Sequence, residues 1–119
     1  MEKKDLKPTG VFKYFEEICQ VPRPSKKEEK MIAYLKAFGA KHNLETKVDE
    51  AGNVLIKKPA TPEKENLQTV VLQSHIDMVC EKNNDVQHDF LTDPIETEID
   101  GEWLKAKGTT LGADNGIGV

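Results

Sequence analysis

The chain has 119 residues, of which 37% are hydrophobic and 32% are charged, and its formal net charge is −4 at pH 7. The length suits one domain, and the acidic balance disfavours a nucleic-acid partner, which needs a basic face. No apolar run approaches the ~18–20 residues of a membrane span, two cysteines are too few for a disulfide scaffold, and no signal-peptide pattern follows residues 1–5. We therefore expect a cytoplasmic protein with no nucleic-acid or membrane partner.

Two amphipathic helices are predicted in the first part of the chain. Apolar residues recur at helical spacing from about 9 to 19, with Thr9 as a possible cap. Prolines at 22 and 24 end this helix, because proline lacks the backbone N–H that a helix needs. The sequence SKKE at 25–28 is typical of a capping box, and the second helix is predicted to extend to about residue 41. The apolar stripe predicted to be buried on this helix comprises Met31, Ile32, Leu35 and Phe38.

Two β-hairpins are predicted further along. Residues 44–48 and 53–58 alternate in part between apolar and polar side chains on either side of a turn. Residues 95–99 alternate in the same way, and residues 103–106 answer them after Asp100-Gly101, a strong tight-turn signal.

A buried strand is predicted between the hairpins, at residues 69–72. Its short β-branched apolar run is typical of a strand covered on both faces, as in a parallel or mixed sheet. Helices followed by such strands indicate an α/β fold class.

His75 and Asp77 follow this strand and form a candidate metal-binding motif. Side chains two residues apart on an extended chain share a face, and open α/β sheets bind ligands at the carboxyl ends of their strands. A neutral imidazole is a common zinc ligand, and a neighbouring carboxylate can fix its tautomer from behind. A His-x-Asp triplet also arises by chance in about one chain in five of this composition, so the motif alone is weak evidence.

Asp114 is a second candidate ligand, within the glycine-rich sequence GADNG at 112–116. Flanking glycines allow the backbone to approach a site closely, and a carboxylate placed there could bridge two metal ions. The alternative is a simple turn or a helix N-cap, and local sequence leaves both interpretations open.

Together, these motifs resemble the metal-site signatures of the M20 metallopeptidases, above all the aminoacyl-histidine dipeptidases. The first signature is matched by VVLQSHIDMVCEK at 70–82, and the second by KGTTLGADNGIGV at 107–119. The sequence FEEICQVPRPS at 15–25 resembles the N-terminal helix and turn of the family. The resemblance therefore covers nearly the whole chain in the expected order.

The resemblance implies a role for each matched residue. His75 would bind one metal ion, Asp77 would be the catalytic aspartate that orients His75, and Asp114 would bridge two ions. The peptide bond after Asp114 would be cis. The implied cofactors are two divalent ions, most naturally zinc, although histidine and carboxylate ligands also accept manganese or cobalt.

The resemblance also implies an extent and an activity. Residues 1–119 would form the N-terminal part of a zinc-peptidase-like catalytic domain, a mixed β-sheet flanked by helices. The general base, the remaining ligands and a dimerisation domain would follow residue 119, so the full-length protein is expected to be a homodimer. The implied reaction is hydrolysis of dipeptides of the Xaa-His type, such as β-alanyl-histidine, by a metal-activated water.

The chain alone is expected to bind metal weakly and to be inactive. The alternative is a truncated relative that serves as a non-catalytic binding or structural module. A coding sequence that continues past Val119 with glutamate and histidine ligands would favour the enzyme.

The other histidines and cysteines receive structural interpretations. His42 follows a helix end, and His88 lies in a polar loop where we expect solvent around it. Cys19 fits an apolar stripe and is predicted to be in the core, whereas Cys80 lacks a local base that would make it a nucleophile. Trp103 is expected to pack on the second hairpin.

Overall fold

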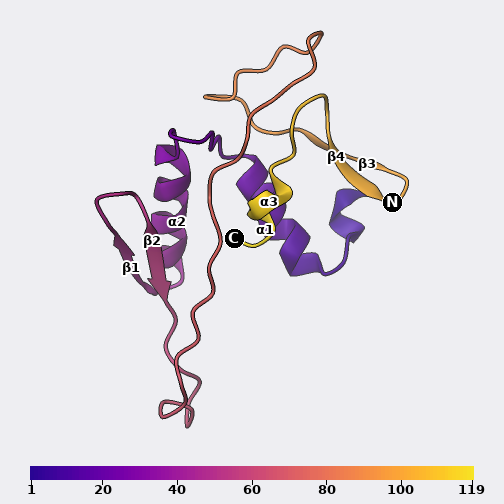
Figure 1. Cartoon of the computed structure of the whole chain (residues 1–119). Helices are drawn as coiled ribbons and strands as arrows, with labels where there is room; N and C mark the ends of the chain where they lie inside the picture. Colours follow the sequence, from indigo (N-terminus) through magenta and orange to yellow (C-terminus); the bar gives the residue numbers. More distant parts are fainter.

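The computed structural model describes all of the residues from Met1 to Val119. Its elements are the 3-10 helix η1 (Lys3–Asp5), the helices α1 (Thr9–Cys19), α2 (Glu29–Lys41) and α3 (Ala113–Gly116), and the strands β1 (Glu45–Val48), β2 (Val54–Lys57), β3 (Thr97–Asp100) and β4 (Trp103–Ala106). In Figure 1, α1 and α3 lie at the centre, with α2 and the β1–β2 hairpin on one side and the β3–β4 hairpin on the other. None of the helices combines the length and the apolar character that crossing a membrane requires.

Both predicted helices form, with differences at their starts. Pro8 rather than Thr9 is the N-cap of α1. The capping box predicted at 25–28 is not formed, because Glu28 is the N-cap of α2 without a side-chain cap bond and the Ser25 hydroxyl donates to the Asp77 carboxylate instead. Ser25 therefore binds the segment that carries the His-x-Asp motif instead of capping α2.

The apolar stripe of α2 is only partly covered. Met31 is buried, as predicted, whereas Ile32, Leu35 and Phe38 are half-buried. Leu35 and Phe38 line an open apolar groove between α1 and α2, which explains their remaining exposure.

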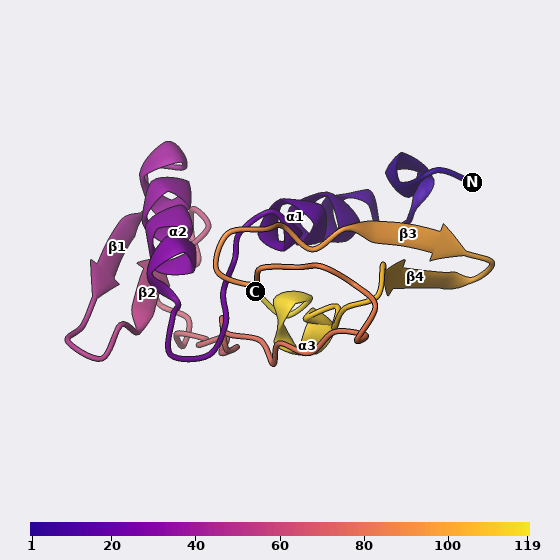
Figure 2. The same cartoon turned by 90° about the horizontal axis from the view of Figure 1, so that it is seen from above.

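Both predicted hairpins form as separate antiparallel sheets of two strands. Glu45 pairs with Lys57 in the first, and Thr97 pairs with Ala106 in the second. Seen from above, the two hairpins lie at opposite ends of the molecule (Figure 2). The packing role predicted for Trp103 is wrong: its side chain is 73% exposed, because alternation along β4 turns Leu104 and Ala106 inward instead.

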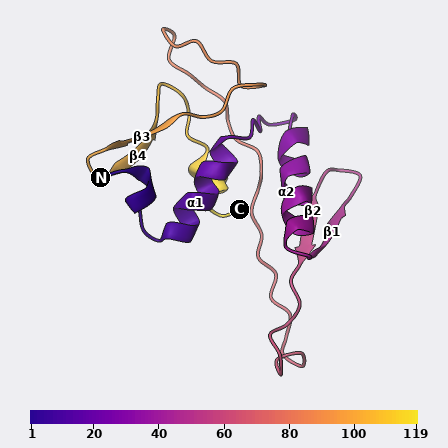
Figure 3. The same cartoon turned by 180° about the vertical axis from the view of Figure 1, so that it is seen from behind.

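The strand predicted at residues 69–72 is absent. Val70, Val71 and Leu72 are 79%, 78% and 92% exposed, and Figure 3 shows this part of the chain as an extended tube. A buried strand needs neighbours to satisfy its backbone N–H and C=O groups, and neither hairpin pairs with this segment. The α/β class is confirmed, but its sheets here are the two antiparallel hairpins rather than one mixed sheet.

A small core lies under the segment that carries His75 and Asp77. It is formed by Phe15, Cys19, Met78 and Ile95, which confirms the core position predicted for Cys19. The Ile95 amide donates to the Cys19 carbonyl at 2.9 Å. Because Met78 directly follows Asp77, its burial anchors the motif to α1.

Candidate functional site

The His-x-Asp segment is held by the turn that follows α1. The Met78 amide donates to the Arg23 carbonyl at 3.0 Å, and the Ser25 amide donates to the Met78 carbonyl at 3.4 Å. These bonds form a short parallel bridge between Pro24 and Met78. The turn sequence PRPS thus fixes the position of Met78, and with it the positions of His75 and Asp77, which come just before Met78 in the chain.

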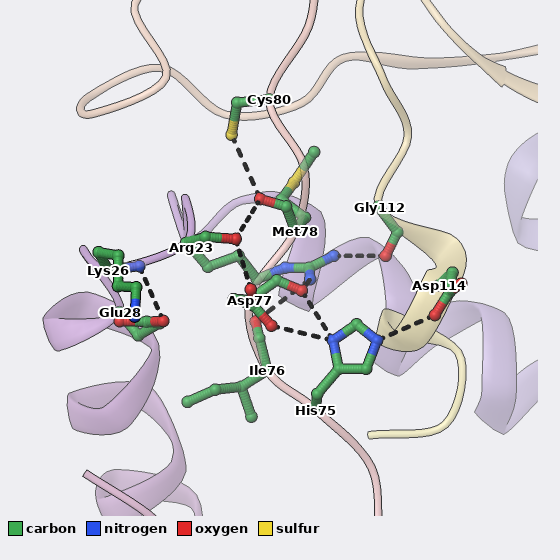
Figure 4. A network of polar contacts seen from close by, with 11 residues as sticks. Arg23, Lys26, Glu28, His75, Ile76, Asp77, Met78, Cys80, Gly112 and Asp114 are labelled. Carbon is green, nitrogen blue, oxygen red and sulfur yellow. Dashed lines mark hydrogen bonds and ion pairs between the residues drawn. The ribbon is translucent and has the colours of Figure 1, made fainter. Parts of the chain in front are cut away.

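The structure brings His75 and Asp77 together, as Figure 4 shows. The Nδ1 atom of His75 lies 3.0 Å from Oδ1 of Asp77 and 3.2 Å from the Asp77 carbonyl oxygen. The other carboxylate oxygen of Asp77 accepts the Ser25 hydroxyl. That hydrogen bond is the main reason why the pKa of Asp77 is lowered, and His75 adds to the effect, because both partners favour the ionised carboxylate.

Asp114 approaches the same imidazole from the other side. Its Oδ1 atom lies 2.9 Å from Nε2 of His75, although the two residues are 39 positions apart. This contact is the largest cause of the raised pKa of His75, and Asp77 raises it further. Both side chains are open to solvent, His75 at 55% and Asp114 at 94% exposure.

The backbone around Asp114 departs from a simple helix start. The N-cap of α3 is Gly112, in the left-handed region with φ of 76°, so the N-cap alternative for Asp114 is not the one observed. The peptide bond between Asp114 and Asn115 is cis, as the resemblance implied. The Asp114 carboxylate is therefore free of capping and faces His75.

Arg23 is a residue of this site that sequence reasoning missed. Its side chain is 1% exposed. Nη1 donates to the carbonyls of Ile76 at 3.3 Å and Asp77 at 3.4 Å, and Nη2 donates to the carbonyl of Gly112 at 2.7 Å. One available signal was that Arg23 is the only arginine of the chain and stands between two prolines.

The donor set suits part of a divalent metal site. An imidazole nitrogen and a carboxylate oxygen are both good zinc ligands, and His75 and Asp114 supply one of each, 2.9 Å apart and on solvent-exposed side chains. No cluster of three or more histidine, cysteine or acidic side chains in the chain could hold a metal ion, and zinc takes three or four protein ligands. The residues present therefore fit a fraction of a metal centre.

The other histidines and Cys80 lie outside this arrangement. His88 is half-buried and stacks on Phe90 with ring centroids 4.5 Å apart, so the solvated position expected for it is wrong. His42 packs against Phe38 at the end of α2. Burial raises the pKa of the Cys80 thiol, which agrees with the expectation that Cys80 is not an activated nucleophile.

Two known proteins are similar to nearly all of the chain. It is 50% identical to the cytosol non-specific dipeptidase of Escherichia coli (strain K12) over 118 residues, which are 99% of this chain and 24% of that protein. It matches the crystal structure of aminoacylhistidine dipeptidase from Vibrio alginolyticus with a TM-score of 0.94 and 52% identity, again over 99% of this chain and 24% of the other. The chain thus spans about a quarter of the length of these relatives. No family model matches the sequence.

Proposed function

We propose that residues 1–119 form the N-terminal part of a dinuclear metallodipeptidase catalytic domain of the M20 type, because nearly the whole chain is similar to two dipeptidases and carries the motifs described above. The observation that carries this proposal is the placement of His75 between Asp77 and Asp114. A metal-binding histidine needs a supporting carboxylate on one ring nitrogen and leaves the other to the ion; Asp77 on Nδ1 fits the first part, and Nε2 faces a second candidate ligand, Asp114.

His75 would bind a metal ion through Nε2. Asp77 accepts a hydrogen bond from Nδ1–H and so leaves the Nε2 lone pair to the ion. In the structure Nε2 faces Asp114 at 2.9 Å, an ordinary distance for an Nε2–H that donates a hydrogen bond to the carboxylate. A cation would replace that proton, and binding would therefore release it.

Asp114 would bridge two ions. Its Oδ1 atom faces His75, whereas its almost fully exposed side chain keeps the other oxygen available to a second cation. Two zinc ions, or manganese or cobalt, would supply an acidified water and a polarised carbonyl for peptide hydrolysis. The general base and the other ligands would come from sequence beyond these residues.

The substrate class follows from the relatives. Both are named dipeptidases, one non-specific and one acting on aminoacyl-histidine. We therefore propose a dipeptide substrate for the full-length protein, with Xaa-His dipeptides such as β-alanyl-histidine among those hydrolysed. We expect a cytosolic homodimer, with the location taken from the name of the E. coli relative.

The test begins with the complete reading frame that encodes these residues. Its product should hydrolyse β-alanyl-histidine, lose that activity in a chelator and recover it with zinc. His75→Ala should abolish turnover, whereas His42→Ala, a change at the far end of α2, should leave it intact. Activity that persists in chelator or in His75→Ala would contradict the proposal, and an inactive product would favour a non-catalytic module. The 119-residue chain alone should bind zinc weakly and show no turnover.

A further inference from the structure

We propose that Arg23 is a positioning residue that sets the separation between the two segments carrying His75 and Asp114. The proposal rests on the function proposed above, in which these two side chains bind metal. Figure 4 shows the Arg23 guanidinium behind the site, between the chain at His75–Asp77 and the loop before Asp114.

Arg23 connects the two segments close to the ligands themselves. Its Nη1 atom donates to the two residues that follow His75, and its Nη2 atom donates to Gly112, two residues before Asp114. Apart from the His75–Asp114 contact itself, the other hydrogen bonds between the two parts of the chain lie further away, between residues 79–83 and 108–110. Arg23 is therefore the nearest connection that does not involve the two candidate ligands and that can control the distance from His75 to Asp114.

The glycine-rich loop is shaped around this guanidinium. A Cβ atom added at Gly112 would lie 2.6 Å from Nη2 of Arg23, and one added at Gly116 would lie 2.7 Å from the same atom. Only glycine therefore lets the loop before and after Asp114 approach so closely. The loop and the arginine fit one another on both sides of the candidate bridging carboxylate.

The chemistry of arginine suits this role better than that of lysine. A guanidinium carries five donors in a rigid planar fork, whereas an ammonium is a compact point charge. Arg23 uses the two arms of the fork for different segments, forms no ion pair, and leaves Nε buried without a partner. Burying a charge on carbonyl oxygens alone is costly, so a purely space-filling role would be better served by an apolar side chain.

The test compares Arg23→Lys and Arg23→Met with the parent 119-residue chain. The first readout is the nuclear Overhauser contact between the His75 ring and the Asp114 β protons, and the second is zinc affinity by calorimetric titration with zinc chloride. We expect both variants to lose the contact and to bind zinc at least tenfold more weakly, with Arg23→Met no better than Arg23→Lys. Folded variants that retain the contact and the affinity would overturn the proposal.

A matched control separates positioning from general stability. Met31 is as deeply buried as Arg23 but lies on α2. Met31→Ala should lower the urea midpoint without altering the His75–Asp114 contact or zinc affinity. If Met31→Ala weakens both readouts as much as the Arg23 variants do, Arg23 acts only through stability and the proposal fails.

Two further measurements keep the outcomes distinct. If the parent and His75→Ala bind zinc equally, the metal assignment fails, and the Overhauser contact still decides the role of Arg23. If the Arg23 variants unfold, the role of Arg23 is tested in the parent chain instead. Its Arg23 Nη protons should exchange slowly with water and show nuclear Overhauser contacts to the α protons of Asp77 and Gly112. Rapidly exchanging Nη protons without those contacts would overturn the proposal.

Discussion

The imidazole of His75 and the carboxylate of Asp114 face each other at 2.9 Å across 39 positions of sequence. The second ring nitrogen lies 3.0 Å from Asp77, so both nitrogens are directed at carboxylates. This pairing raises the pKa of His75, chiefly through Asp114. In the metal site proposed above, an ion would therefore compete with a proton for the same Nε2 lone pair.

Zinc affinity should consequently increase with pH. The His75 pKa lies above its ordinary value of 6.5, so below that pKa a proton must be displaced, and the apparent affinity should fall by up to about tenfold per pH unit. Calorimetry at pH 6, 7 and 8, in buffers of different ionisation enthalpy, should report about one proton released per zinc bound at the acidic end. The same affinity at all three values would contradict this prediction.

Asp114→Asn provides the matched comparison for that experiment. The substitution keeps the shape of the side chain but removes the charge, so the pKa of His75 should fall toward 6.5 and the pH dependence of zinc binding should move to more acidic values. Zinc affinity at pH 8 should also fall by at least tenfold, because a ligand is lost. An unchanged affinity would remove Asp114 from the proposed ligands.

Ser25→Ala should weaken the site without removing a ligand. The Ser25 hydroxyl holds Asp77 and is the main cause of its lowered pKa, so the variant should raise that pKa toward 3.8 and reduce zinc affinity by up to about tenfold. Ser74→Ala is the control, since the exposed Ser74 lies beside His75 in the sequence. Equal affinities of the two variants would contradict a role for Ser25.

The same pair of variants has a definite pH signature in stability. A carboxylate with a lowered folded-state pKa stabilises the fold above its unfolded value, near 3.8, and that contribution is lost as the pH falls through the lowered pKa. In urea unfolding, Ser25→Ala should therefore be less stable than Ser74→Ala at pH 7, and the difference should shrink as the pH falls below 3.8 and through the lowered pKa of Asp77.

Short-range patterns predicted those parts of the structure that depend on neighbours in sequence. Alternation and the Asp100-Gly101 turn predicted the β3–β4 hairpin, because both strands and their turn are contiguous. The run at 69–72 has the composition of a buried strand, but strand formation depends on partners that the local sequence does not encode. Composition and β-propensity therefore predicted a strand at residues 69–72 where the structure has none.

In the candidate site, too, contacts between sequence neighbours could be predicted, whereas contacts between distant residues could not. The i, i+2 spacing placed His75 beside Asp77, but only the resemblance joined them to Asp114. Arg23 went unnoticed because its function depends on carbonyl oxygens 53 to 89 positions away. Every residue has a carbonyl group, so an acceptor set of this kind leaves no residue pattern to detect.

Gly112→Ala should destabilise the loop that carries Asp114. Gly112 has a φ of 76°, and a Cβ there would lie 2.6 Å from Nη2 of Arg23 and 2.8 Å from the sulfur of Met78. Both neighbours are buried, so neither can move freely, and we expect a loss of about 1–3 kcal/mol in unfolding free energy. Gly10→Ala is the control, because a Cβ at Gly10 meets nothing within 4 Å and alanine favours a helix by up to about 1 kcal/mol. A Gly112→Ala variant as stable as Gly10→Ala would contradict the described loop.

The two cysteines should differ sharply in reactivity, which tests the core beneath the site. Cys19 is 2% exposed, and burial, reinforced by Glu16, raises the pKa of its thiol to about 12. Cys80 is half-buried, and burial raises the pKa of its thiol from 9.0. Because the thiolate is the reactive form, iodoacetamide at pH 8 should label Cys80 slowly and Cys19 at least tenfold more slowly. Mass spectrometry of the labelled peptides measures the ratio, and urea should bring the two rates together. Equal labelling of both cysteines without urea would mean that Cys19 is not packed against Phe15 and Met78 as described.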